Sequence, residues 1–139
     1  VGIPYKIPAD MRAALWKKFM LNVGVNQTSA VVGSSYGALQ QGGFARDIAV
    51  AAMHEVVALA RYEGVDRPPE MVEPSISIVD TLSPKGKCSM LQDIEARRLT
   101  EVDIFGGTVV ALAHKHGLAV PVHEMLAKII TAKEAAYNL

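Results

Sequence analysis

Judged by type and spacing, the first residues of this chain that could take part in chemistry are Lys18, Asn22 and Asn26. Residues four apart lie one above another on an α-helix, so these three side chains would form one polar stripe. Apolar residues fill most of the surrounding sequence, which predicts a helix buried on several sides. Each unpaired polar group on such a helix would cost about 1–3 kcal/mol, so we expect the stripe to line a wet cleft.

Lys18 is the only member of this stripe that can transfer a proton. Partial burial would lower its pKa toward neutrality, and the ammonium group could then act as a general acid or stabilise a carbonyl oxygen. Asn22 and Asn26 do not titrate, but each side chain offers a donor and an acceptor to a polar ligand. Spacing alone leaves a structural alternative open, and favours it: Lys18 would reach solvent and the asparagines would bond neighbouring loops.

Ser89 and Glu101 form a second candidate pair, twelve positions apart, around a predicted short helix and the start of the next one. Free N–H groups at a helix N-terminus could bind a ligand carboxylate or hydroxyl near Ser89. The helix dipole would stabilise Glu101, so a structural role is equally plausible. This pair alone points only weakly to a site.

The remaining reactive side chains form no recognised motif. The histidines have no metal-ligand spacing, and Cys88 has no histidine in a known local signature, so we predict no metal site and no cysteine nucleophile. The chain contains neither G-x-G-x-x-G nor a P-loop. By itself it should therefore not bind a dinucleotide in the Rossmann manner.

Helices must position these side chains, because the sequence lacks the alternation of strands and helices that a parallel sheet needs. We expect a lead-in or linker at 1–9, and then a helix capped by Asp10 that runs to about Gly33 and bends near Gly24 or Asn26. Further helical segments are expected at 36–40, 44–63, 69–82, 89–97, 100–116 and from 121 to near the C-terminus. The predicted fold is an all-α, multi-helix bundle over residues 10–139.

Three residues are expected to delimit these helices. Gly64 and Gly117 should end two of them, since glycine readily adopts the left-handed conformation after a helix. Thr100 should begin another, with Asp103 in the N3 place of an arrangement like a capping box.

Composition limits the classes of partner. The 139 residues suffice for one domain with a real core, and half of them are hydrophobic, which excludes a disordered chain. The net charge is zero and no basic block occurs, so nucleic acid and anionic membranes are unexpected partners.

No apolar run reaches the roughly 18–20 residues that span a bilayer, and no signal segment begins the chain. The single Cys88 suits a reducing cytoplasm. The missing initiator Met would fit a fragment of a longer chain.

Three segments, in order, resemble the C-terminal helical domain of the ketopantoate reductase (2-dehydropantoate 2-reductase) family. Trp16–Asn26 is similar to the family segment in which a lysine is followed by two asparagines at four-residue intervals. Ser89–Asp103 resembles the family signature S-M-L-Q-D…T-E-I-D, and Gly117–Val122 resembles the G-(I/L)-x-x-P turn before the last helix. The resemblance covers nearly the whole chain. It implies the fold of the C-terminal domain of the 6-phosphogluconate dehydrogenase-like superfamily.

The resemblance implies an activity and a role for each candidate. Full-length members bind NADPH mainly on an N-terminal Rossmann domain and reduce 2-dehydropantoate to (R)-pantoate, a step toward pantothenate and coenzyme A. By motif match, Lys18 would be the general acid that protonates the substrate carbonyl oxygen as hydride arrives. Glu101 would be a second catalytic residue that holds the substrate hydroxyl and could contact the cofactor. Asn22, Asn26 and Ser89 would position the 2-oxoacid substrate.

The resemblance also implies partners and a location. A cytoplasmic enzyme is expected, in which the N-terminal Rossmann domain is the partner of this chain, and a homodimer remains open. The isolated chain is expected to be inactive. Two departures concern the side of the pocket that selects the substrate: Tyr36 stands where some members carry asparagine, and Ile104–Gly107 replaces the frequent Y-I-N-G. Another 2-oxoacid substrate therefore remains open, as does a non-catalytic helical binding or dimerisation module.

Overall fold

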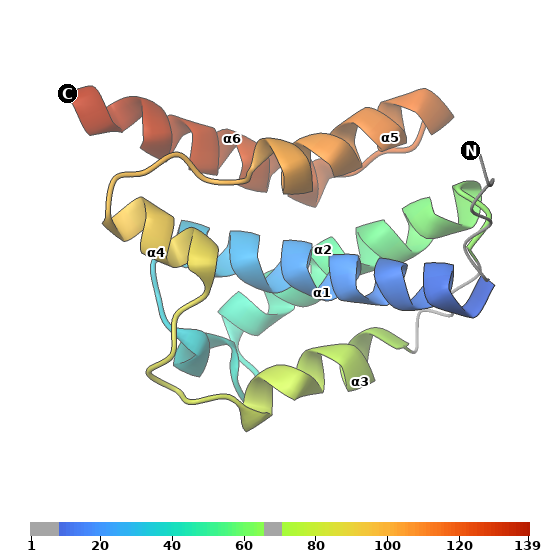
Figure 1. Cartoon of the computed structure of the whole chain (residues 1–139), viewed down its shortest axis with the longest axis horizontal. Coiled ribbons are helices and arrows are strands. Elements are labelled where there is room, and N and C mark those ends of the chain that lie inside the picture. The colour runs from blue at the N-terminus through green and yellow to red at the C-terminus, as the bar shows by residue number, and fades with distance from the viewer. Residues whose placement is uncertain (1–8, 66–70) are drawn as a thin grey trace, which may run out of the picture.

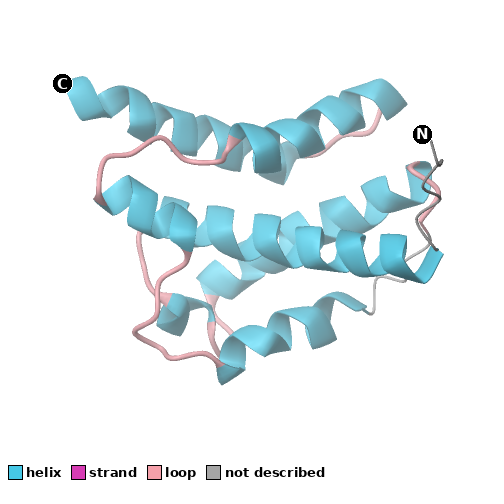
Figure 2. Cartoon of the chain, in the orientation of Figure 1, coloured by secondary structure: helices cyan, strands magenta, loops and turns pink. Residues whose placement is uncertain are grey.

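The computed structural model describes residues 9–65 and 71–139, with side chains from Met11 onward. The described residues form helices and loops without any strand (Figure 2). The helices are α1 (Ala9–Val32), α2 (Phe44–Tyr62), α3 (Val72–Ile76), α4 (Ser89–Glu95), α5 (Thr108–His116) and α6 (Pro121–Ala135). Short 3₁₀ turns lie at η1 (Tyr36–Leu39), η3 (Ser77–Thr81) and η5 (Ala136–Asn138), and a π-helical turn forms η4 (Asp103–Gly107). The all-α prediction is confirmed.

The helices are arranged around α1 and α2, which pack against each other at the centre of the bundle (Figure 1). Helices α5 and α6 lie on one side of this pair and α3 lies on the other. Helix α4 contacts α1 beside its C-terminal half. None of the described helices is both long and apolar enough to cross a bilayer.

Most predicted helix boundaries are confirmed. Helix α2 ends before Gly64 and α5 before Gly117, and both glycines have positive φ (+82° and +66°). Helix α1 is continuous through Gly24 and Asn26 and begins at Ala9, so Asp10 lies inside it rather than before it. The linker was predicted at 1–9, but its last residue, Ala9, belongs to α1. Residues 1–8, the side chain of Asp10 and the predicted helix start at 69 lie outside the described residues.

Two helix predictions need correction. The segment predicted as one helix to residue 82 is divided into the short helix α3, which ends at Ile76, and the 3₁₀ turn η3, which begins at Ser77. The helix expected from Thr100 begins with the π-helical turn η4, in which the N–H of Gly107 donates to the carbonyl of Val102 at 2.9 Å.

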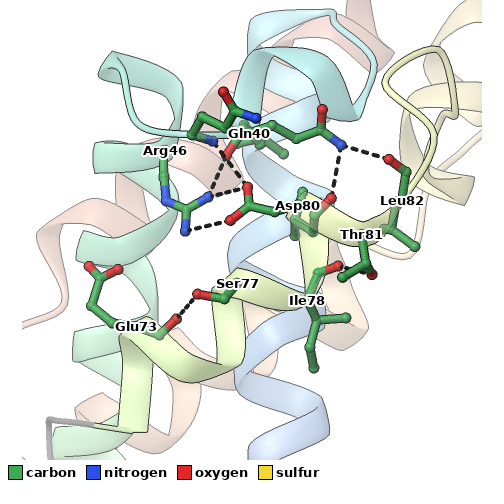
Figure 3. A network of polar contacts seen from close by, with 11 residues as sticks. Gln40, Arg46, Glu73, Ser77, Ile78, Asp80, Thr81 and Leu82 are labelled. Carbon is green, nitrogen blue, oxygen red and sulfur yellow. Dashed lines mark hydrogen bonds and ion pairs between the residues drawn. The ribbon is translucent and has the colours of Figure 1, made fainter.

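A polar network holds η3 against the turn that precedes α2 (Figure 3). Arg46 forms an ion pair with Asp80 at 2.9 Å, and the backbone N–H of Gln41 donates to the same carboxylate at 3.0 Å. These contacts lower the pKa of Asp80, with the Gln41 hydrogen bond as the largest cause. The side-chain amide of Gln40 donates to the carbonyls of Val79 and Leu82. The network fixes the chain where it leaves η3 for the loop into α4.

The carboxylate of Glu55, on α2, caps the N-terminus of α6. It accepts hydrogen bonds from the backbone N–H groups of Val122 and His123, both at 2.9 Å, and from Nδ1 of His123 at 2.8 Å. A carboxylate only accepts, so Nδ1 carries the ring proton. Desolvation is the largest single effect on the pKa of Glu55 and raises it, but the hydrogen bonds and the His123 charge together outweigh it and leave the pKa lowered.

We predict that Glu55→Gln destabilises the protein by about 1–3 kcal/mol at pH 7, because charged hydrogen bonds to the α6 N-terminus are lost. The folded pKa of Glu55 is lowered, so its stabilisation is complete above the ordinary value of 4.5 and is lost as the pH falls through the folded value. Urea denaturation from pH 7 to pH 3 should therefore show the two proteins converging in acid. Glu95→Gln, which removes an exposed partner of Lys87, is the control and should cost at most about 1 kcal/mol. A difference that persists unchanged in acid would contradict the assignment.

Candidate functional site

The stripe of Lys18, Asn22 and Asn26 lies on α1, as predicted, but Lys18 is exposed while the two asparagines are half-buried. The predicted burial of Lys18 is therefore wrong. Its apolar neighbours Phe19 and Met20 turn away from the stripe and belong to the core. Apolar neighbours in sequence indicate that a helix has a buried face, but not that the opposite face is covered.

Helix α4 brings Ser89 to the Asn26 end of the stripe. The thiol of Cys88 donates to the carbonyl of Asn26 at 3.8 Å and accepts from the N–H of Leu91 at 3.4 Å, so it caps α4 and fastens it to α1. Ser89 is the next residue, and its side chain is exposed. Burial raises the pKa of the Cys88 thiol, which suits a structural thiol rather than a nucleophile.

Glu101 lies in the bend before η4, with its side chain exposed. Its carbonyl accepts from the N–H groups of Ile104 and Phe105, both at 3.0 Å. The ring of Phe105 meets the edge of Phe19 with centroids 6.5 Å apart, and Phe19 directly follows Lys18. The segment that carries Glu101 is thus packed against the turn of α1 that carries Lys18.

Thr100 makes contacts that the sequence did not predict. Its hydroxyl accepts from the N–H of Val102 at 3.2 Å, and its backbone N–H donates to Glu134 on α6 at 2.7 Å. The expected arrangement with Asp103 is replaced, because the carboxylate that reaches back to the Thr100 N–H comes from a distant helix. No local pattern could have revealed a partner 34 residues away.

The predicted site residues therefore come from three neighbouring elements: α1, the start of α4 and the bend before η4. Lys18, Ser89 and Glu101 all expose their side chains, so the candidate site is an open face rather than a closed pocket. Among the described residues, no group of three or more His, Cys, Asp or Glu could hold a metal ion. This face can offer one mobile proton, two amides, one hydroxyl and one carboxylate to a ligand.

Sequence reasoning missed an apolar groove beside this face. Leu15, Trp16 and Phe19 of α1 line it together with Thr108 and Leu112 of α5. Leu15 is 52 % exposed, which is high for a large apolar side chain on a central helix. A signal was present in the sequence, because two large apolar residues, Leu15 and Trp16, directly precede the stripe.

The residues that depart from the family pattern have packing roles. The N–H of Tyr36 donates to the carbonyl of Gly86 at 2.9 Å, and a Cβ on Gly86 would lie 3.0 Å from the Tyr36 ring. Desolvation, followed by the charge of Cys88, raises the pKa of Tyr36. Gly106 is buried against the Gln27 side chain, which occupies the space that a Cβ would need. Tyr36 is packed against the loop at Gly86, and Gly106 of η4 is packed against Gln27 of α1.

Comparisons with known proteins give the family that this chain matches. A family model described as the C terminal of ketopantoate reductase PanE/ApbA matches residues 10–134. A 2-dehydropantoate 2-reductase from Vibrio cholerae is 30% identical over 93% of this chain and 43% of its own length. The chain thus spans less than half the length of this curated relative.

Two solved structures share the fold. A dimeric ketopantoate reductase from Staphylococcus aureus has a TM-score of 0.83 at 20% identity, over 93% of this chain and 45% of its own. A D-mandelate dehydrogenase in complex with NADH and anilino(oxo)acetate has a TM-score of 0.85 at 22% identity, over 94% of this chain and 43% of its own. At these identities the likeness shows the fold alone.

We predict that Gly106→Ala destabilises the protein by about 1–3 kcal/mol, because the new methyl group would displace the buried Gln27 side chain and press on Ala127 at 3.2 Å. Gly107→Ala is the matched control. Its nearest neighbour, the carbonyl of Val102, lies 3.7 Å from the new Cβ, so stability should change by less than about 1 kcal/mol. Thermal denaturation of the two variants checks the difference, and equal losses would contradict the close packing at Gly106.

Proposed function

The chain belongs to the ketopantoate reductase family, as its C-terminal helical domain, and from this premise we propose that it forms the substrate-binding and proton-donating half of an NADPH-dependent 2-oxoacid reductase. The proposed reaction is the reduction of 2-dehydropantoate to (R)-pantoate, a step toward pantothenate and coenzyme A. The observation that carries the proposal is the open face on which the Lys18 stripe meets the elements bearing Ser89 and Glu101.

Lys18 is the proposed general acid. As hydride reaches the carbonyl carbon, negative charge develops on the carbonyl oxygen, and the ammonium group of Lys18 donates a proton there to give the hydroxyl. Lys18 is the only group of its stripe that can do so. Its exposure supports this role, because the ammonium group is accessible to a substrate held between this face and another domain.

The other four residues orient the substrate. The half-buried amides of Asn22 and Asn26 have less freedom than exposed ones, so they suit fixed contacts to the 2-oxoacid. Ser89 contributes its hydroxyl at the start of α4. Glu101, acting as a hydrogen-bond acceptor, holds the substrate hydroxyl. These assignments follow the motif match, and the shared open face supports them.

NADPH would supply the hydride, and we propose that an N-terminal Rossmann domain binds most of it. The exposure of Lys18 and Glu101 fits a cofactor that is presented from outside this chain, and Glu101 could contact it. The apolar groove at Leu15, Trp16 and Phe19 suits contact with another domain, because exposed apolar surface is stabilised when covered. A homodimer and a cytoplasmic location, where the Cys88 thiol would stay reduced, are part of this proposal.

Two alternative functions can be separated from this proposal by experiment. Tyr36 and Gly106 depart from the family pattern, which favours another 2-oxoacid as the substrate of the same chemistry. A panel of 2-oxoacids assayed with NADPH separates that case from 2-dehydropantoate. A non-catalytic binding or dimerisation module would instead lack a strand followed by G-x-G-x-x-G in the coding sequence upstream of Val1.

We predict that Lys18→Ala in the complete protein costs about 2–5 kcal/mol of transition-state stabilisation, measured as the fall in kcat/KM with 2-dehydropantoate and NADPH. The matched control is Lys17→Ala, which removes the neighbouring lysine from a small apolar pocket formed with Trp16 and Met20. That variant should retain most of the activity. An unchanged kcat in Lys18→Ala would remove Lys18 from the mechanism.

The 139-residue chain alone should bind NADPH negligibly and show no turnover, because it has no phosphate-binding glycine loop. Isothermal calorimetry with NADPH tests the binding, and the complete protein serves as the positive control. A micromolar dissociation constant for the isolated chain would show that this domain itself holds the cofactor.

A further inference from the structure

The last turn of α6 carries two adjacent charged residues that both reach other elements. Lys133 donates from Nζ to the carbonyls of Ala30 and Val31 at 2.8 and 3.1 Å. These carbonyls belong to the last turn of α1, where an α-helix leaves its final C=O groups without internal partners. Lys133 therefore joins α6 to the helix that carries the Lys18 stripe.

Glu134, the next residue, reaches a different segment. Its Oε2 accepts from the backbone N–H of Thr100 at 2.7 Å and from the Thr100 hydroxyl at 2.5 Å. The same hydroxyl accepts from the N–H of Val102 at 3.2 Å. The backbone N–H groups of the residues before and after Glu101 are thus both bonded. That of Thr100 donates to the Glu134 carboxylate directly, and that of Val102 donates to the Thr100 hydroxyl.

These contacts form one continuous path between the two parts of the proposed site. Lys133 and Glu134 are consecutive on a regular helix, so the α1 terminus and the Glu101 bend are fixed at a set separation. Thr100 and Glu134 are partly buried, and a hydrogen bond that involves a carboxylate away from bulk water is strong and directional. The side chain of Glu101 is exposed, so packing does not restrain it. Its position therefore depends on the hydrogen bonds made by the backbone groups next to it.

We propose that Glu134 is a positioning residue for Glu101. Through its bonds to Thr100, Glu134 holds the bend that carries Glu101 in place relative to Lys18 on α1. This inference rests on the proposed function, because it assigns a purpose to the placement of Glu101. Glu134 does not touch the substrate. It acts by limiting the movement of the bend that carries the Glu101 carboxylate, and small displacements of a catalytic group can cost large factors in rate.

A double-mutant cycle in the complete protein tests the coupling. Glu134→Ala should lower kcat/KM by about tenfold when Glu101 is present, and by less than about twofold in a Glu101→Ala background. A purely structural contribution of Glu134 would give the same factor in both backgrounds, and that result would overturn the inference. If Glu101→Ala alone leaves kcat/KM unchanged, the role of Glu101 in the proposed function fails first and the positioning role fails with it.

Three further variants separate positioning from loss of fold. Glu55→Gln removes the carboxylate that caps the other end of α6, far from the Glu101 bend in sequence, and should lower the denaturation midpoint while leaving kcat/KM within about twofold. At Thr100, valine removes the hydroxyl while nearly keeping the volume, and serine restores it. We expect Thr100→Val to lose severalfold in kcat/KM and Thr100→Ser to retain activity within about twofold. If both Thr100 variants remain fully active, the proposed path through Thr100 is wrong, whether or not Glu134→Ala folds.

Discussion

The close approach of α1 and α2 at Gly24 is the constraint on which the other elements depend. A Cβ at Gly24 would lie 2.6 Å from the side chain of Met53 and 3.0 Å from the carbonyl of Ala49, so only glycine allows the two helices this separation. Once α1 is held there, one face is in the core and the opposite face can carry polar groups. The stripe of Lys18, Asn22 and Asn26 lies on the side of α1 that faces away from α2, the helix that packs most extensively against α1.

The second feature on which the candidate site depends is the set of contacts that fix the position of α6. Its N-terminus is capped by Glu55 of α2, and its C-terminal turn reaches α1 through Lys133 and the bend before η4 through Glu134. All three contacts join residues far apart in sequence, and all involve a charged group that satisfies backbone atoms. Such contacts hold a helix in both position and rotation, which apolar packing alone specifies less tightly. The helix farthest along the chain therefore connects the elements that carry the candidate site.

The features predicted best from the sequence are those that depend on residues close together in the chain. Helix periodicity and the stop signals at Gly64 and Gly117 predicted the helices well, and the four-residue spacing correctly placed the stripe on one helix. The burial of Lys18 and the capping of Thr100 by Asp103 were predicted wrongly. The exposure of Lys18 depends on which faces of α1 the other helices cover, and the carboxylate that bonds Thr100 comes from Glu134 of α6, 34 residues away. A local pattern predicts which kind of partner a polar residue requires, but the tertiary fold determines which residue provides it.

Because of the π-helical turn at Asp103–Gly107, the packing of α5 depends on the number of residues in this segment. A π turn accommodates one residue more than an α-helical turn, so it shifts the angular phase of everything that follows. Val109 and Ala113 of α5 face the core only because of that phase. Loss of a single residue between Glu101 and Thr108 would rotate both side chains by roughly 100° around the helix axis. In this region an alignment gap of one residue would therefore mark a change of packing face.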